Sequence, residues 1–239
     1  MTASETISLF SGIGTFLAAI ATFLTVREII KQRKSSYRPE LVLSKIVFCA
    51  SADMRRGRNL PALWTNDHKV TENSREIEIP LSNIGMGAAK SVVVKWDFPI
   101  TEALSLVENI HSDANDEASF TFKSDILTIK SKLLGSFSSM WGNQKTQMLD
   151  YVLPASIQTE PTTIKIPHAY MALVSSLMYL AAQKDLLELP AIAPLTATFE
   201  YRDIADERRK AAYNIEFGLI ALFGDGFHAY LEPKRQKNI

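Results

Sequence analysis

The chain has a single cysteine and none of the short motifs that mark cofactor chemistry. Because Cys49 is the only cysteine, no intrachain disulfide can form, which favours a reducing compartment. The phosphate-binding loop G-x-x-x-x-G-K-[ST], the dinucleotide motif G-x-G-x-x-G and the nucleophile elbow G-x-S-x-G are all absent. We therefore expect no cofactor.

The sequence also lacks metal-ligand spacing and a charge excess. The histidines His68, His111, His168 and His228 are scattered, so no metal site is predicted. The apolar segment around Cys49 is typical of a strand, where a buried structural thiol is commoner than a nucleophile. Lys and Arg number 26, as do Asp and Glu, so no overall field attracts nucleic acid. We expect no catalytic residue and no enzyme activity; a membrane-tethered hydrolase is an alternative.

What the sequence does have is a long apolar run near its N-terminus. No residue from Ile7 to Val26 carries a charge. At about 1.5 Å per residue a helix over this run spans about 30 Å, the thickness of the hydrocarbon core of a bilayer. A transmembrane helix is therefore predicted, with membrane lipid as a partner. The residues assigned to the span are Ile7, Phe10, Ile13, Phe16, Leu17, Ile20, Phe23, Leu24 and Val26.

Two other interpretations of the run fit less well. Ala19-Ile20-Ala21 has the A-x-A form of a signal-peptide cleavage site, but a secretory signal begins with a positive region and the only charged residue before the run is Glu5. An amphipathic helix packed on the domain would show one polar stripe, and this run is apolar on every side.

The charges after the run predict the orientation of the anchor. Cations flanking a span stay on the cytoplasmic side. The N-terminus is therefore expected outside a bacterial inner membrane and the rest of the chain in the cytoplasm. Attraction to anionic headgroups is also expected at this flank. Its charged residues are Arg27, Lys31, Arg33, Lys34 and Arg38, against Glu28.

Small residues in the run have the four-residue spacing that lets helices approach closely. A homo-oligomer is therefore expected. If several copies gathered, the hydroxyls of Ser11, Thr15 and Thr22 would line a narrow passage, which gives an alternative function as an oligomeric pore-forming or membrane-disrupting effector. The residues assigned to helix association are Ser8, Gly12, Gly14, Ala18 and Ala19.

Residues 1–38 are expected to form the anchor and a basic juxtamembrane helix, and residues 39–239 one mainly β domain. Alternating apolar residues predict its strands. The charged segment between the last two strands predicts a hairpin connection. The predicted strands are Glu40–Ala50, Arg75–Leu81, Lys90–Phe98, Ser119–Lys130, Thr162–Pro167, Leu195–Tyr201 and Tyr213–Leu219.

Two segments of the domain have helical patterns instead. Thr101–Asn109 predicts one or two helical turns after Pro99, and His168–Leu189 predicts a longer helix. The part from His168 to Gln183 has no acid and no lysine but is shorter than a usual span. We expect it to pack on a sheet or in a subunit contact, and a second membrane pass stays open.

The segment Leu81–Val94 reads LSNIGMGAAKSVVV. Its residues predict a strand ending at Leu81, positive φ at Asn83 and Gly85, and a bulge at Gly87. The segment resembles the L-x-N-x-G-x-G-x-A-x-x-V-x-V pattern of immunoglobulin-like β-sandwiches of the bacterial cell-adhesion-related (CARDB-like) type.

The layout also resembles uncharacterised bacterial single-pass membrane proteins with a cytoplasmic β-sandwich. Together these resemblances imply an N-terminal transmembrane helix followed by an immunoglobulin-like antiparallel β-sandwich with one inserted helix at about 168–189. They imply no active site.

Arg55, Arg56 and Arg58 surround a glycine in a polar loop, where three guanidinium groups could bind a phosphate, a nucleotide or a lipid headgroup. A solvated hairpin tip is the alternative. The loop His111–Glu117 has alternating oxygen ligands but lacks the turn glycine and distal glutamate of an EF-hand. The sequence as a whole predicts a membrane-anchored, non-enzymatic binding or assembly module that presents a β domain to a cytoplasmic protein partner.

Overall fold

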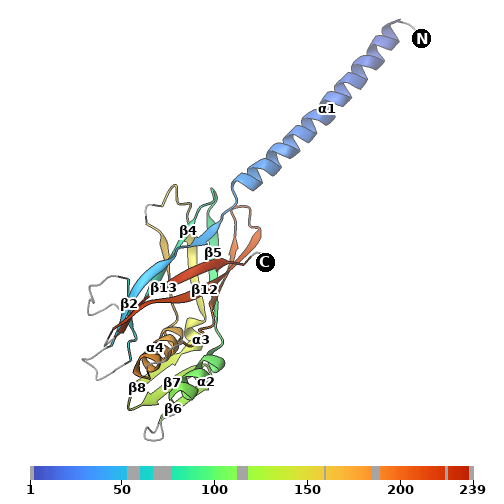
Figure 1. The fold of residues 1–239 in the computed structure, drawn as a ribbon. Helices are drawn as coiled ribbons and strands as arrows, with labels where there is room; N and C mark the ends of the chain where they lie inside the picture. The colour runs from blue at the N-terminus through green and yellow to red at the C-terminus, as the bar shows by residue number, and fades with distance from the viewer. Residues whose placement is uncertain are drawn as a thin grey trace.

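The computed structural model describes residues 3–52, 60–66, 77–111, 118–158, 160–184, 189–223 and 226–236. A long helix, α1 (Ala3–Ser36), projects from a strand-rich domain, and the C-terminal end of the described chain lies on the side of the domain from which α1 emerges (Figure 1). In the described residues one long helix precedes a strand-rich body.

The largest sheet has seven strands and curls into a half-barrel (Figure 1). All of its neighbouring strands are antiparallel. Val92, Val94 and Trp96 are buried and alternate with more exposed residues, as the sequence predicts. In spatial order the strands are β3 (Leu63–Thr65), β2 (Ile46–Ser51), β13 (Gly226–Arg235), β12 (Arg208–Phe223), β11 (Leu195–Arg202), β5 (Ala89–Asp97) and β9 (Thr146–Val152).

The predicted C-terminal hairpin is confirmed. Strands β11 and β12 pair in register from Leu195↔Ile215 to Arg202↔Arg208. The turn between them contains Asp206 at a φ of 63°. Strand β12 continues well past the start of β11 and pairs there with β13. The charged connection thus forms a tight turn, and within the paired stretch Leu195, Ala197, Phe199, Tyr213 and Ile215 are buried.

Two three-stranded sheets complete the domain. The first has the order β1 (Leu41–Leu43), β4 (Glu78–Asn83) and β10 (Thr162–Lys165), and the second the order β6 (Ser119–Lys123), β7 (Ile126–Ser131) and β8 (Gly135–Met140). Residues 40–50, predicted as one strand, are two strands in different sheets. The break comes where the amide of Ser44 donates to the carbonyl of Pro80 at 3.0 Å, because the chain crosses there from one sheet to the other.

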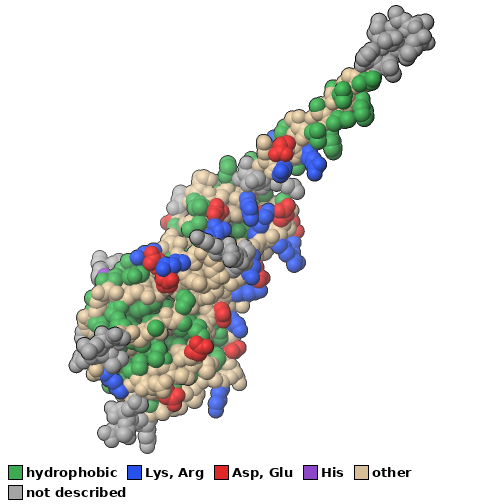
Figure 2. All heavy atoms as spheres, turned by 45° about the vertical axis from the view of Figure 1, so that its right-hand side comes forward, with side chains coloured by type: hydrophobic (Ala, Val, Ile, Leu, Met, Phe, Trp, Pro, Cys, Tyr) green, Lys and Arg blue, Asp and Glu red, His purple; other side chains and the backbone are tan. Residues whose placement is uncertain are grey.

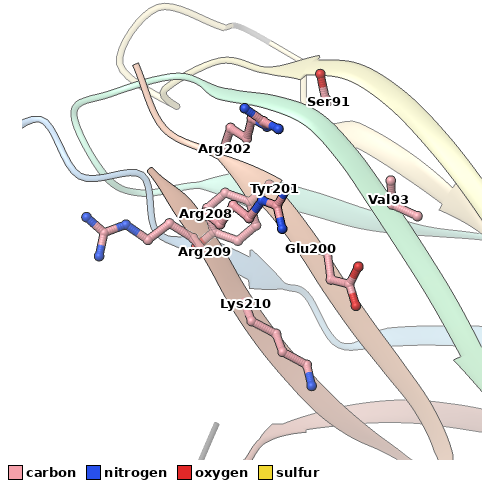
Figure 3. A pocket seen from close by; sticks show the side chains of 8 residues that line it. All are labelled: Ser91, Val93, Glu200, Tyr201, Arg202, Arg208, Arg209 and Lys210. Atoms are coloured by element: carbon pink, nitrogen blue, oxygen red, sulfur yellow. The ribbon is translucent and has the colours of Figure 1, made fainter. Parts of the chain in front are cut away.

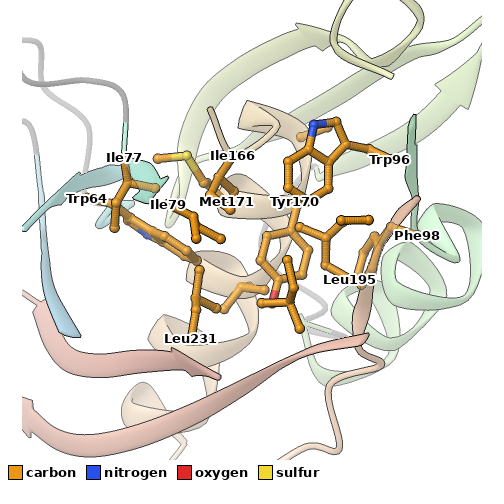
Figure 4. Packing of buried hydrophobic residues seen from close by; sticks show 14 of the residues in the cluster. Trp64, Ile77, Ile79, Trp96, Phe98, Ile166, Tyr170, Met171, Leu195 and Leu231 are labelled. Atoms are coloured by element: carbon orange, nitrogen blue, oxygen red, sulfur yellow. The ribbon is translucent and has the colours of Figure 1, made fainter. Parts of the chain in front are cut away.

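The domain contains helices α2 (Ile100–His111), α3 (Trp141–Gln144) and α4 (His168–Gln183). Helix α4 is almost entirely buried, and its Tyr170 lies edge-on to Trp64 and Phe98 at ring-centroid distances of 6.1 and 4.9 Å. Figure 4 shows Tyr170 and Met171 pointing into a cluster contributed by several strands. The second membrane pass that the sequence left open is therefore not what this segment does, and the helix ends at Gln183, before the predicted Leu189.

The strand-rich, antiparallel character of the domain is confirmed, but two facing sheets with one inserted helix are not observed. The described part of the domain has three sheets and three helices. The physical reason lies in α4, which is apolar on nearly every side and must be surrounded. Its bulk lies among the sheets, in the region that a second flat sheet would occupy in a sandwich.

Candidate functional site

Helix α1 is the feature with the clearest functional geometry. An 18-residue stretch within Ser11–Arg33 has a mean hydropathy of 1.7, and none of that stretch is buried against the domain. Among the described residues it is the only helix long and apolar enough to cross a membrane, a property that anchors and signal sequences share. Figure 2 shows hydrophobic side chains along α1 and charged ones where it meets the domain.

The residues that the sequence assigned to the span all lie on this one helix. Phe16, Leu17 and Phe23 are 66, 59 and 68% exposed. A water-exposed helix of this composition would be costly, since each large apolar side chain left in water forfeits about 1.5–3 kcal/mol of transfer free energy. The helix therefore requires an apolar environment that the domain does not supply.

The two sides of α1 differ in side-chain size. At about 100° per residue, the large residues Ile13, Phe16, Leu17, Ile20, Phe23 and Leu24 fall on one half of the helix. Ser11, Gly12, Gly14, Thr15, Ala18, Ala19, Ala21, Thr22 and Thr25 fall on the other. A Cβ atom placed at Gly12 or Gly14 would meet nothing within 4 Å. The small half is thus open to close approach by another helix.

Three hydroxyls on the small half are satisfied within the helix itself. Thr15, Thr22 and Thr25 each donate to the carbonyl oxygen four residues earlier at 2.9 Å. Such bonds allow threonine to lie in lipid without a partner helix. The span can therefore exist as a single helix, and any association would depend on packing and not on unsatisfied polar groups.

The junction between α1 and the domain is built around Asn83. This side chain is completely buried. Its Oδ1 accepts from the amides of Glu40 at 2.9 Å and Gly85 at 3.0 Å, and its Nδ2 donates to the carbonyls of Gly87 at 2.7 Å and Val152 at 3.1 Å. One amide thus ties the segment after α1 to the β4–β5 turn and to strand β9.

The two glycines of the same turn allow the backbones to touch. A Cβ at Gly85 would overlap the carbonyl oxygen of Arg38, and one at Gly87 would overlap the carbonyl oxygen of Tyr37. Neither glycine nor Asn83 has a positive φ; the positive-φ residue of this region is Ser91, at 49°. The predicted positive φ values and the bulge at Gly87 are therefore wrong, and the strand runs to Asn83 and not Leu81. Close approach is the reason for glycine here.

Further bonds hold the first residues of the domain. The hydroxyl of Tyr213 donates to the carbonyl of Leu41 at 2.6 Å, and burial raises the pKa of this phenol, so it remains a donor. Arg235 pairs with Glu40 at 2.6 Å. The end of β13 and the middle of β12 thus bind the chain just after α1, and these bonds restrict movement between the helix and the domain.

A shallow depression lies beside the β11–β12 hairpin, close to this junction. It has a volume of about 520 Å³, and Figure 3 shows its lining side chains on strands β5, β11 and β12. Arg202 pairs with Asp206, and Arg209 with Asp203, whereas Arg208 and Lys210 form no ion pair within the described residues. The residues lining the depression are Ser91, Val93, Glu200, Tyr201, Arg202, Arg208, Arg209 and Lys210.

Carboxylates in this region are held in the charged form. Burial tends to raise the pKa of Asp203, but hydrogen bonds from the Glu207 amide, the Arg209 side chain and the Ala205 amide outweigh it and lower the pKa. A hydrogen bond from Lys95 lowers the pKa of Glu200. The acids of the hairpin thus neutralise their own partners, and the remaining local charge is positive.

Groups with chemical reactivity are not gathered elsewhere in the described part of the chain. No cluster of three or more His, Cys, Asp or Glu side chains there could hold a metal ion. His111 Nε2 lies 3.2 Å from the hydroxyl of Ser131, whose oxygen accepts from the amides of Leu133 and Leu134. This hydroxyl stabilises a turn. Burial raises the pKa of Cys49, which keeps the thiol protonated.

Arg55, Arg56 and Arg58, and the loop 112–117, lie outside the described residues. Arg208 and Lys210, near the end of α1, belong to the β11–β12 hairpin, whose charged segment the sequence predicted only as a connection. Only the spacing of Asn83, Gly85 and Gly87 signalled the junction in advance.

Comparison with known proteins gives a family without an assigned function. A family model described as a domain of unknown function, DUF8453, matches residues 7–221. The resemblance of residues 81–94 to a cell-adhesion-related sandwich is thus replaced by a match that spans most of the chain, α1 included. Searches of curated proteins and of solved structures found no significant match. Because the match covers far more than half of the chain, including most of α1 and the domain as far as β12, the chain belongs to the DUF8453 family.

Proposed function

We propose that this protein is a single-pass protein of the bacterial inner membrane, with its N-terminus outside and its domain in the cytoplasm. In this role it is a non-enzymatic binding or assembly module that presents a strand-rich domain to a cytoplasmic protein partner. The observation that carries the proposal is that α1 is long, apolar and unburied while the domain closes its own core.

Several features support an anchor over a cleaved signal. The family match begins at residue 7, so the helix belongs to the unit that defines the family. The helix is continuous from Ala3 to Ser36 and leads directly into the Asn83 junction.

The proposed orientation rests on the exposed cations Arg27, Lys31, Arg33 and Arg38 after the span. Reporter fusions at the C-terminus test it: a cytoplasmic reporter should be active and a periplasmic one silent. A control with Arg27 and Lys31 changed to Glu should weaken this preference. A signal from the periplasmic reporter alone would contradict the orientation.

Self-association through the small half of α1 is part of the proposal. Gly12→Leu and Ala18→Leu should shift the detergent-solubilised protein towards monomer in native mass measurements, because a large side chain separates the helix backbones. Ile20→Leu, on the large half, is the matched control and should leave the distribution unchanged. A wild-type protein that is already monomeric would remove this part of the proposal.

A pore-forming role is the second candidate, favoured by the hydroxyls gathered on the same half of α1. In this version clustered helices permeabilise the bilayer. Liposome leakage should then appear with wild type and fall with Gly12→Leu. No leakage with either protein would leave the anchored module as the better description.

A further inference from the structure

Three turns at the α1 end of the domain each expose a large apolar side chain. The β4–β5 turn exposes Ile84 and Met86 at 62 and 65%, the turn after β9 exposes Ile157 at 69%, and the β11–β12 turn exposes Ile204 at 52%. Single exposed apolar residues are ordinary, but several on neighbouring turns mark an interaction surface.

These turns lie around the end of α1. The β4–β5 turn touches the backbone of Tyr37 and Arg38 through its glycines. The turn after β9 is joined to it by the bond from the Ala155 amide to the Asn83 carbonyl, at 2.8 Å. The β11–β12 hairpin approaches the same place, because Tyr213 of β12 donates to the carbonyl of Leu41 at 2.6 Å. Figure 1 shows the base of α1 at this end of the domain.

Cations lie near the exposed apolar residues, and the acids of the β11–β12 turn, Asp203, Asp206 and Glu207, are paired with Arg202 and Arg209. Arg38 follows α1, and Arg208 and Lys210 on β12 have no ion-pair partner among the residues that the structure describes. Lys and Arg near an anionic membrane surface each contribute about 1 kcal/mol of attraction. Apolar turns flanked by such cations are the chemistry of a surface that inserts shallowly among lipid headgroups.

The length of the connection agrees with contact. From Ile30, the last apolar residue of α1, to the end of the helix at Ser36 the rise is about 9 Å. The headgroup layer is about 5–7 Å deep, and spans tilt by about 20° on average. A helix end of this length places the base of the domain close to the headgroup layer.

We infer that the α1 end of the domain, formed by Ile84, Met86, Ile157 and Ile204 with Arg38, Arg208 and Lys210, docks on the anionic surface of the membrane that α1 spans. The inference rests on the proposed membrane anchoring. Docking fixes the orientation of the domain and points the far end, with α2 and strands β6–β8, towards the cytoplasm.

Spin labels on the full chain test this contact. In a Cys49→Ala background, single cysteines replace Met86, Ile204, Leu17 in the span and Ile126 at the far end of the domain. The protein is reconstituted in vesicles of phosphatidylcholine with equal parts phosphatidylglycerol. Collisions with membrane-soluble oxygen are compared with those of a water-soluble nickel complex.

The ratio of oxygen collisions to nickel collisions should be several-fold higher for labels at positions 86 and 204 than for the label at position 126. Arg208→Glu with Lys210→Glu should reduce that preference, and Lys123→Glu with Lys130→Glu at the far end should not. If the label at position 17 is in lipid but the labels at 86 and 204 have the same collision ratio as the label at 126, the docking proposal is wrong and the anchoring proposal stands. If position 17 is itself in water, the anchor fails. Spin–spin broadening at 86 and 204 without added oxygen contact would place a second copy there and overturn the lipid assignment.

Discussion

Helices α1 and α4 are both apolar on almost every side, yet α1 is not buried against the domain, whereas α4 lies at its centre. Every described residue of α1 from Ser11 to Arg33 is exposed, whereas twelve of the residues of α4 are buried. The difference teaches that an apolar surface requires only a non-aqueous environment. Length and attachment determine whether that environment is lipid or protein.

The attachments of the two helices differ in kind. Helix α1 is held at one end only, by the junction around Asn83. Helix α4 is held along its length, and its Ser175 accepts from the indole of Trp64 at 2.8 Å and donates to the carbonyl of Pro61 at 2.7 Å. A helix bound in this way cannot leave the domain without unfolding it.

We expect the largest change in the free energy of unfolding from truncating a leucine in α4, and the matching truncation in α1 is its control. Leu173→Ala in α4 should lower the free energy of unfolding by about 2–5 kcal/mol, because the side chain is fully buried and leaves a cavity. Leu17→Ala in α1 should leave domain unfolding unchanged. Urea unfolding in detergent, followed by the fluorescence of the buried tryptophans, measures both. Equal losses would mean that α1 contributes to the domain's core.

A pair of glycine substitutions sharpens the comparison at the junction. Gly87→Ala should destabilise the domain by about 1–3 kcal/mol, since its Cβ would overlap the backbone of Tyr37. Gly12→Ala should not, because nothing lies within 4 Å of its Cβ. The same unfolding curves give the result. A neutral Gly87→Ala variant would show that the chain after α1 is loosely held.

Two adjacent serines of α4 differ in their hydrogen bonds: Ser175 bonds residues outside the helix, and Ser176 bonds a carbonyl of the helix itself. Ser175→Ala should cost about 1–2 kcal/mol, because the Trp64 indole N–H is left buried without an acceptor. Ser176→Ala should cost less than about 1 kcal/mol, because its hydroxyl bonds only the Ala172 carbonyl of the same helix. A red shift of the tryptophan emission should accompany only the first change. Identical behaviour of the two variants would contradict the role assigned to Ser175.

The smallest effect concerns pH. The pKa of Asp203 is lowered on folding from an unfolded value of about 3.9. Its stabilisation is therefore present above that pH and is lost as the pH falls through the folded pKa. Asp203→Asn should reduce the loss of unfolding free energy in acid, and this reduction should be less than about 1 kcal/mol, as is usual for pairs near the surface.

Helix α4 has no Asp, Glu, Lys or Arg, so the loss caused by Leu173→Ala should be the same at pH 7 and in acid. Unfolding at several pH values checks both statements. A pH-dependent cost of Leu173→Ala would show that the two regions are coupled.

Sequence reasoning recovered elements whose pattern is local. The alternation at Val92, Val94 and Trp96 predicted β5, and the charged connection predicted the β11–β12 hairpin, because neither depends on distant residues. It failed at residues 40–50, where the pattern is continuous but the partners belong to two sheets. Asn83, Gly85 and Gly87 were predicted to matter for their backbone dihedral angles, whereas their role is a tertiary contact with the backbone of residues 37–40.

One long apolar helix, a basic flank and a strand-rich domain can be predicted from the sequence, because hydropathy and periodicity are properties of neighbouring residues. The burial of α4 in the core is visible only in the tertiary structure. The same holds for the three turns at the base of α1 and for the position of the β11–β12 cations beside them. These outcomes depend on contacts between residues far apart in the chain, which no local pattern records.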